Sequence, residues 1–193
     1  MDPFTILTSI PTPFLRDNVD TDLIIPASYL KTVSRLGLGE GAFRSLRFTE
    51  DGTPHGESIF DQQPYCDSQI LVAGANFGCG SSREHAVWAL LDLGYRCIIA
   101  ESFADIFASN CAKNGVLTIA LDRAQVASLA EDGEAGHKIT VDLEAQSISR
   151  RSGYSMAFPI EPYRKRRLLE GLDEVGSTLD RHTEAIKDFE ARR

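Results

Sequence analysis

Between Ile70 and Leu121, short apolar segments alternate with helical patterns, and this alternation constrains the fold more than any other feature of the sequence. Three continuous apolar runs have the length of buried strands, and they cover residues 70–73, 97–100 and 116–121. The two segments between these runs have helical spacing and are each followed by a glycine, at residues 81–93 and about 102–114. Because a β-α-β-α-β order brings its strands together in parallel, with right-handed crossovers, we predict an α/β fold.

The segments on either side of this core have a different character. Residues 4–15 are β-prone and contain two prolines, which indicates a strand and its turn. After a short helix capped by Asp122, an alternating strand and a hairpin that turns at Ser152 and Gly153 predict an antiparallel appendage. Two more helices are expected, one from Pro162 to about Gly171 and an amphipathic one through Leu179, Ile186 and Phe189.

The length of the chain suits one domain. At 193 residues the chain is large enough for a sizeable core, and we expect a single domain over residues 1–193. Residues 31–69 are rich in glycine and lack a clear periodicity. A loop of this length in a compact domain is usually functional or mobile, so we expect a flexible loop over about residues 31–69.

Charge and cysteine usage exclude several classes of protein. The net charge of −8 disfavours binding to nucleic acid or to an anionic membrane surface. No run of 18 apolar residues and no basic leader occur, and the four cysteines form neither a C-x-x-C pair nor a metal motif. We therefore expect a reduced, cytoplasmic protein that binds no metal ion and no cofactor itself. The one basic cluster, residues 164–167, is expected on a solvated helix face.

The stretch from Gly74 to Gly94 has two interpretations. Ser81 and Glu84 have the spacing of an S-x-x-E capping box, in which the serine only starts a helix. Alternatively, the glycines and the free N–H groups of a helix N-terminus form an anion cradle, to which Arg83 adds a fork of donors for a carboxylate. The stretch contains neither the dinucleotide fingerprint nor a phosphate loop. A small carboxylate is the best candidate ligand.

A second polar motif lies upstream, in the sequence NVDTDLIIP. Asp20 and Asp22 have one interpretation as turn residues whose side chains bond nearby N–H groups. The alternative is that one of these carboxylates orients an arginine or a water beside a carboxylate site. The local sequence leaves both open.

Three segments in order give the chain a specific resemblance. NFGCGSSREHAVWAL, with NVDTDLIIPASYL upstream and SFADIFASNCAKNGVL downstream, resembles the small subunits of 3-isopropylmalate dehydratase, in the aconitase superfamily. The resemblance implies a swivelling β/β/α domain of the aconitase type, made as a separate chain. It also implies a large-subunit partner that carries a [4Fe–4S] cluster, in a heterodimer or heterotetramer that is active only as the complex.

The resemblance further implies a hydro-lyase reaction in leucine biosynthesis. Family members interconvert 2-isopropylmalate and 3-isopropylmalate by dehydration and rehydration through isopropylmaleate. By motif, Ser81 matches the general base, Ser82 and Arg83 match carboxylate-binding positions, and Asp22 matches an acidic residue that lines the site. This implies a catalytic role for Ser81 in place of the capping role.

The resemblance implies that the loop after ASYL sets substrate choice, and in this sequence that loop reads KTVSRLGLGEGAF. We expect Arg35 to hold the distal carboxylate, and Leu36 or Leu38 to meet the alkyl group. Val87 stands where the family usually has proline, which leaves a related substrate open: citramalate, 2,3-dimethylmalate or homoaconitate. An alternative from another class is a binding module that holds a free carboxylate and does no chemistry.

Overall fold

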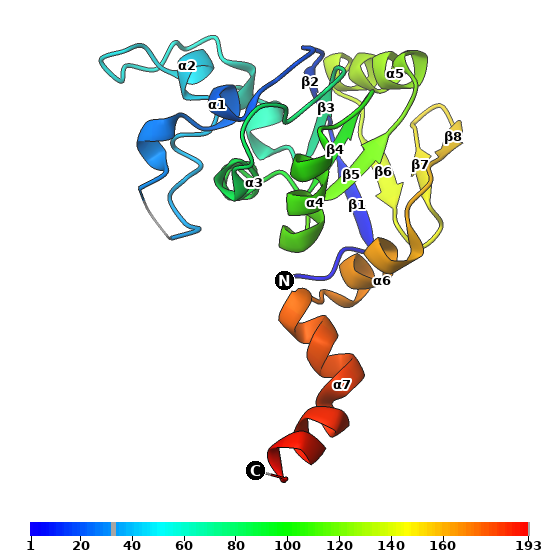
Figure 1. Cartoon of the computed structure of the whole chain (residues 1–193). Coiled ribbons are helices and arrows are strands. Elements are labelled where there is room, and N and C mark those ends of the chain that lie inside the picture. Colours follow the sequence, from blue (N-terminus) through cyan, green and yellow to red (C-terminus); the bar gives the residue numbers. More distant parts are fainter. Residues whose placement is uncertain (32–33, 193) are drawn as a thin grey trace.

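The computed structural model describes residues 1–31 and 34–192 of the chain. Within these ranges the strands form two four-stranded sheets, one parallel and one antiparallel (Figure 1). The parallel sheet consists, in spatial order, of β2 (Thr12–Phe14), β3 (Ile70–Ala73), β4 (Cys97–Ala100) and β5 (Leu117–Ala120). The antiparallel sheet consists, in spatial order, of β1 (Ile6–Ser9), β6 (Ile139–Asp142), β7 (Ser147–Ser149) and β8 (Ser155–Ala157).

The predicted parallel arrangement is confirmed. β3 pairs with β4, and β4 with β5, in parallel register. Helix α3 (Glu84–Asp92) connects the first pair and α4 (Asp105–Asn114) the second. β3 and β4 are buried along their whole length, which explains their uninterrupted apolar sequences. Strands that are covered on both faces have no position for a polar side chain.

The parallel sheet separates two hydrophobic cores. Alternate residues of one strand point to opposite faces, so Leu71 belongs to one core and Ile70 to the other. α3 and α4 cover the first face, whereas helix α5 (Arg123–Glu134) and the antiparallel sheet cover the second (Figure 1). The result is the predicted β/β/α layering.

The N-terminal segment differs from the expected strand and turn, because it forms two strands in two different sheets. β1 pairs with β6 in the antiparallel sheet, and β2 pairs with β3 in the parallel sheet. The change of sheet falls at Ile10 and Pro11, where proline has no N–H group for a ladder. Pro13 lies within β2, which tolerates it as the outer strand of the sheet.

The segment predicted as a long loop contains several short helices. These are α2 (Arg44–Arg47), η2 (Ile59–Asp61) and η3 (Tyr65–Asp67), preceded by α1 (Thr21–Ile24) and η1 (Ala27–Tyr29). Phe43 and Phe60 are buried and stacked, with ring centroids 4.1 Å apart. The Arg47 guanidinium binds the Asp61 carboxylate with two nitrogens and donates to the carbonyl of Gly39 at 2.6 Å. The later part of the loop is therefore packed, and its flexibility stays a prediction.

The C-terminal half has the predicted elements. The Asp122 side chain accepts from the backbone N–H of Gln125 and starts α5, which is longer than expected. β6, β7 and β8 form the antiparallel appendage, with the turn of the hairpin between β7 and β8. Helix α6 (Pro162–Glu170) begins with its proline and ends at Gly171.

The basic cluster of α6 is exposed at Arg164 and Arg166, as expected for a solvated helix face, but the prediction is wrong for Arg167. Arg167 is 8% exposed, beside the buried Leu168. Its guanidinium lies over the ring of Tyr163 at 5.6 Å, and its Nε donates to the carbonyl of Leu172 at 3.3 Å. An arginine can be buried in this way because its aliphatic stem packs against apolar side chains while its guanidinium contacts a carbonyl and a ring.

The last helix, α7 (Glu174–Glu190), has the predicted position and projects away from the two sheets (Figure 1). Phe189 is 60% exposed. The side chains of Leu179 and Ile186 lie outside the described residues. Among the helices that the structure describes, none is long and apolar enough to span a membrane.

Candidate functional site

The loop between β3 and α3, residues 74–83, leaves the parallel sheet at the carboxyl end of its strands. Ligands of open α/β sheets bind at this end. The loop lies so close to its neighbours that two glycines have no room for a side chain. A Cβ on Gly74 would lie 2.2 Å from Asp17 Oδ1, and one on Gly78, where φ is +76°, would lie 2.1 Å from the Phe107 ring.

The NVDTD segment runs beside this loop and is hydrogen-bonded to it at successive positions. The N–H of Gly78 donates to the carbonyl of Val19 at 2.7 Å, and the N–H of Thr21 donates to the carbonyl of Cys79 at 2.9 Å. The N–H of Ser81 then donates to the Thr21 hydroxyl at 3.1 Å. Two motifs about 60 residues apart in the sequence thus form one structural unit.

This pairing brings two of the predicted site residues together. Arg83 Nη1 donates to Asp22 Oδ1 in an ion pair. The Asp22 side chain is 57% exposed and that of Arg83 is 21% exposed. A guanidinium has five N–H donors, and this ion pair uses one of its terminal nitrogens. The alternative in which an aspartate orients an arginine is therefore the observed one for Asp22.

Asp20 has the other of the two roles considered for this motif. Its side chain accepts from the backbone N–H of Leu23 at 2.7 Å and caps α1. Asp20 therefore caps a helix, whereas Asp22, two residues further on, forms an ion pair with Arg83.

Of the two interpretations of Ser81, the capping box is wrong. α3 begins at Glu84, its N-cap residue is Arg83, and no side chain caps it. The Glu84 carboxylate instead accepts from Asn114 Nδ2 at 2.7 Å. Ser81 lies before the helix, where its N–H donates to the Thr21 hydroxyl. Ser81 and Ser82 are both exposed, and the Ser81 hydroxyl has no hydrogen-bond partner among the described residues.

Arg35 lies in a different place from the other predicted residues. Its guanidinium stacks over the Trp88 ring at 5.2 Å, in the body of α3. A cavity of about 220 Å³ lies there, lined by Arg35, Leu36, Trp88, Leu91, Asp92 and Asn114. Leu36 is 80% exposed, whereas Leu38 is only 2% exposed and belongs to the core. Of the two leucines, only Leu36 lines this cavity.

Two further residues, Thr21 and Asn114, shape the site although no motif in the sequence marks them. Thr21 is 1% exposed, and its hydroxyl accepts from the loop that carries Ser81. Asn114 connects α4 to α3, because its side chain also accepts from Trp88 Nε1 at 2.9 Å. Thr21 stands between two exposed aspartates, but nothing local indicates which distant loop its hydroxyl meets.

The cysteines show no sign of a shared metal site. In the described residues, no group of three or more histidine, cysteine or acidic side chains is arranged to hold a metal ion. Burial raises the pKa of the Cys97 and Cys111 thiols well above the ordinary range. Cys79, in the site loop, is half-buried and Cys66 is exposed.

The two-sheet fold and its paired loops place the chain in the class of aconitase-type swivel domains. Residues 1–124 match the family model of the aconitase C-terminal domain, and residues 127–162 match the model described as LeuD_N. The chain is also similar to proteins named 3-isopropylmalate dehydratase small subunit. It is 53% identical to the one from Rhodospirillum centenum over 100% of this chain and 96% of that protein. It is 52% identical to the one from Jannaschia sp., over 99% of this chain and 96% of that protein.

A solved structure extends this similarity. The crystal structure of 3-isopropylmalate dehydratase (leuD) from Methanocaldococcus jannaschii has a TM-score of 0.69 and 27% sequence identity. The match covers 95% of this chain and 99% of that one. The chain belongs to the family of 3-isopropylmalate dehydratase small subunits, which are subunits of a hydro-lyase.

Proposed function

We propose that this chain provides one wall of an active site that it shares with a large subunit, and that it is active only in that complex. The complex converts 2-isopropylmalate into 3-isopropylmalate through isopropylmaleate, in the cytoplasm. The observation that carries the proposal is the pairing of the Thr21 segment with the Ser81 loop. This pairing exposes two serines beside the ion pair of Arg83 with Asp22.

Ser81 is proposed as the general base. In its alkoxide form the Ser81 side chain accepts a proton from the substrate carbon and becomes a hydroxyl, and the start of α3 lies three residues further along the chain. The positive end of a helix stabilises negative charge that develops nearby. The [4Fe–4S] cluster, which we place on the large subunit, supplies Lewis acidity for the departure of the hydroxyl group when it is bound.

Ser82 and Arg83 are proposed to hold a substrate carboxylate. Arg83 keeps donors beyond the one that Asp22 occupies, and a fork of N–H groups matches the two oxygens of a carboxylate. Asp22 orients the guanidinium. Arg35 is proposed to hold the distal carboxylate from the position beside Trp88, with Leu36 next to the substrate alkyl group.

The test is an anaerobic assay with the large subunit of the same organism, in which the absorbance of isopropylmaleate is followed. Ser81→Ala is expected to lower kcat by about 10²–10⁴-fold, the usual effect of losing a general base. Ser155→Ala, which removes an exposed hydroxyl from β8, is the matched control and is expected to leave kcat unchanged.

Three outcomes would contradict parts of the proposal. Full activity of Ser81→Ala in an intact complex would rule out its role as base. A complex that ignores both isopropylmalates but dehydrates citramalate or 2,3-dimethylmalate would rule out the substrate. If the isolated chain binds a carboxylate and no large subunit binds the chain, only the binding-module alternative remains.

A further inference from the structure

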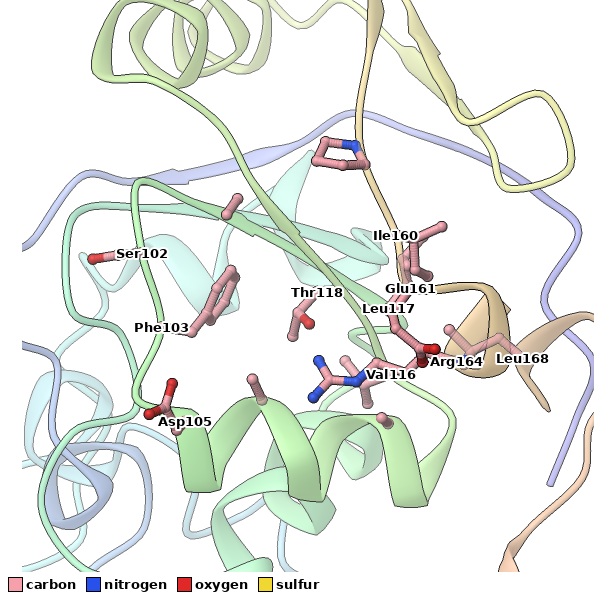
Figure 2. Close-up of a pocket in the computed structure, with 14 residues that line it drawn as sticks. Ser102, Phe103, Asp105, Val116, Leu117, Thr118, Ile160, Glu161, Arg164 and Leu168 are labelled. Carbon is pink, nitrogen blue, oxygen red and sulfur yellow. Dashed lines mark hydrogen bonds between the residues drawn. The ribbon is translucent and has the colours of Figure 1, made fainter. Parts of the chain in front are cut away.

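A groove of about 310 Å³ lies on the side of the parallel sheet away from β2 (Figure 2). Its walls are the outer edge of β5, helix α4 and the segment that leads into α6. Val116, Leu117 and Leu168 are buried and give it an apolar floor. None of the residues proposed for the reaction lines this groove.

The edge of β5 offers backbone groups that the sheet does not use. The N–H groups of Leu117 and Leu121 donate to the carbonyls of Arg96 and Ala100, on the side of β4. Because peptide groups alternate in direction along a strand, Thr118 and Ala120 direct their N–H and C=O groups away from β4. Both residues line the groove. Within the described residues, β5 pairs with no strand other than β4.

The groove also contains an arginine without an ionic partner. Arg164 projects into it from the first turns of α6 (Figure 2), and it forms no ion pair with any described residue. The nearby Glu161 carboxylate is engaged with the start of α6, where it accepts from the N–H groups of Tyr163 and Arg164. Asp105 and Ser102 lie at the other end of the groove (Figure 2). The end at Arg164 therefore attracts an acidic group.

One end of the groove is connected to the site loop. The Ser102 hydroxyl accepts from the N–H of Asn76 at 2.8 Å, and the Ser102 carbonyl accepts from the N–H of Phe77 at 3.0 Å. Phe77 and Phe103 also pair as an isolated parallel bridge. Hydrogen bonds therefore join the loop that carries Ser81 to the end of the groove at Ser102.

We propose that an extended segment of the large subunit adds to the edge of β5 in this groove, with an acidic side chain paired to Arg164. The inference rests on the proposed function, because it takes the large subunit as the occupant. Open strand edges bind extended chains through main-chain hydrogen bonds, while side-chain pockets select the sequence. The open N–H groups of β5 match the main-chain carbonyls of such a segment. The apolar floor matches its apolar side chains, and the Arg164 guanidinium matches its acidic side chain.

Amide hydrogen exchange tests the main-chain part of the proposal. The amides of Thr118 and Ala120 are expected to exchange quickly in the isolated chain and about 10-fold or more slowly in the complex, since a new hydrogen bond protects them. The amide of Ser152, at the turn of the hairpin, is the control and is expected to be unchanged.

Two variants test the contacts one at a time, by the affinity of the folded chain for the large subunit. Ala120→Pro removes an N–H that the β4–β5 ladder does not use, and Ala120→Val keeps that N–H. Arg164→Glu reverses the charge in the groove, and Arg151→Glu makes the same reversal at an exposed position in the hairpin. Ala120→Pro and Arg164→Glu are each expected to weaken binding by about 10-fold or more, with little change for their controls.

The outcomes separate this inference from the proposed function. A complex that forms and turns over isopropylmalate, without protection of the two amides or loss of affinity in the variants, overturns the inference alone. The absence of both complex and turnover overturns the proposed function and the inference with it. Protection of the amides by citrate in the isolated chain, and none by the large subunit, also overturns the inference and indicates a site for a small anion.

Discussion

The backbone N–H of Ser81 donates to the hydroxyl of Thr21 at 3.1 Å, and Thr21 is 1% exposed. This hydrogen bond holds the serine loop outside the first turn of α3. A buried side chain from the upstream motif therefore decides where the proposed base stands.

Removing this acceptor is expected to lower kcat without a comparable change in KM. Thr21→Val keeps the shape of the side chain but leaves the Ser81 N–H without its partner, at a cost of about 1–3 kcal/mol. Thr21→Ser retains the hydroxyl and is expected to retain most of the activity. Steady-state kinetics of the complex and urea unfolding of the isolated chain check this. Equal kcat values for the valine and serine variants would show that the hydroxyl does not position Ser81.

Gly78 is expected to be intolerant of a side chain, because a Cβ would meet the Phe107 ring at 2.1 Å. Gly153 is the matched control, since its φ of +81° is similar and a Cβ there meets nothing within 4 Å. Gly153→Ala is expected to cost about 1–2 kcal/mol, the penalty of a left-handed backbone alone. Gly78→Ala is expected to lower the free energy of unfolding by more than Gly153→Ala does, because the Phe107 ring must also move.

Thermal and urea unfolding of the two glycine variants measure this difference. The double variant Gly78→Ala with Phe107→Ala is expected to be less destabilised than the sum of the single changes, because alanine lacks the Cγ and Cδ atoms that the new Cβ would meet. Additive effects would show that the ring does not limit this position.

Arg35→Ala is expected to raise the KM for isopropylmalate by about 10-fold, because the guanidinium beside Trp88 is proposed to hold the distal carboxylate in the complex. Arg44 is a matched control, because its guanidinium stacks over Phe48 at 5.0 Å in a comparable way. Arg44→Ala is expected to leave KM unchanged. Steady-state kinetics with both isopropylmalates provide the measurement, and an unchanged KM for Arg35→Ala would limit Arg35 to its stacking on Trp88.

The four cysteines are expected to differ in reactivity. Burial raises the pKa of Cys97 and Cys111, so the reactive thiolate form of these residues is suppressed in the native state. A thiol reagent at pH 8 is expected to modify Cys66 first, Cys79 more slowly, and the buried pair only after denaturation. Mass spectrometry of the native and unfolded chain checks this order. Rapid native labelling of Cys97 would contradict the packing of β4.

Local sequence determined the elements whose signals lie within a few residues. The apolar runs predicted β3, β4 and β5, and Asp122, Pro162 and Gly171 marked helix ends that the structure confirms. The three recognisable segments also predicted the family. Such signals can be read from the sequence because hydrophobic periodicity and capping act over one or two turns of chain.

Only the tertiary structure decided how distant segments meet. It paired the Thr21 segment with the Ser81 loop, moved the start of α3 to Glu84, divided the N-terminal strand between two sheets and buried Arg167. Each of these outcomes depends on contacts between residues far apart in the sequence. Local propensity is worth a fraction of a kcal/mol per residue, whereas burying a side chain is worth about 1.5–3 kcal/mol, so packing overrides it wherever the two conflict.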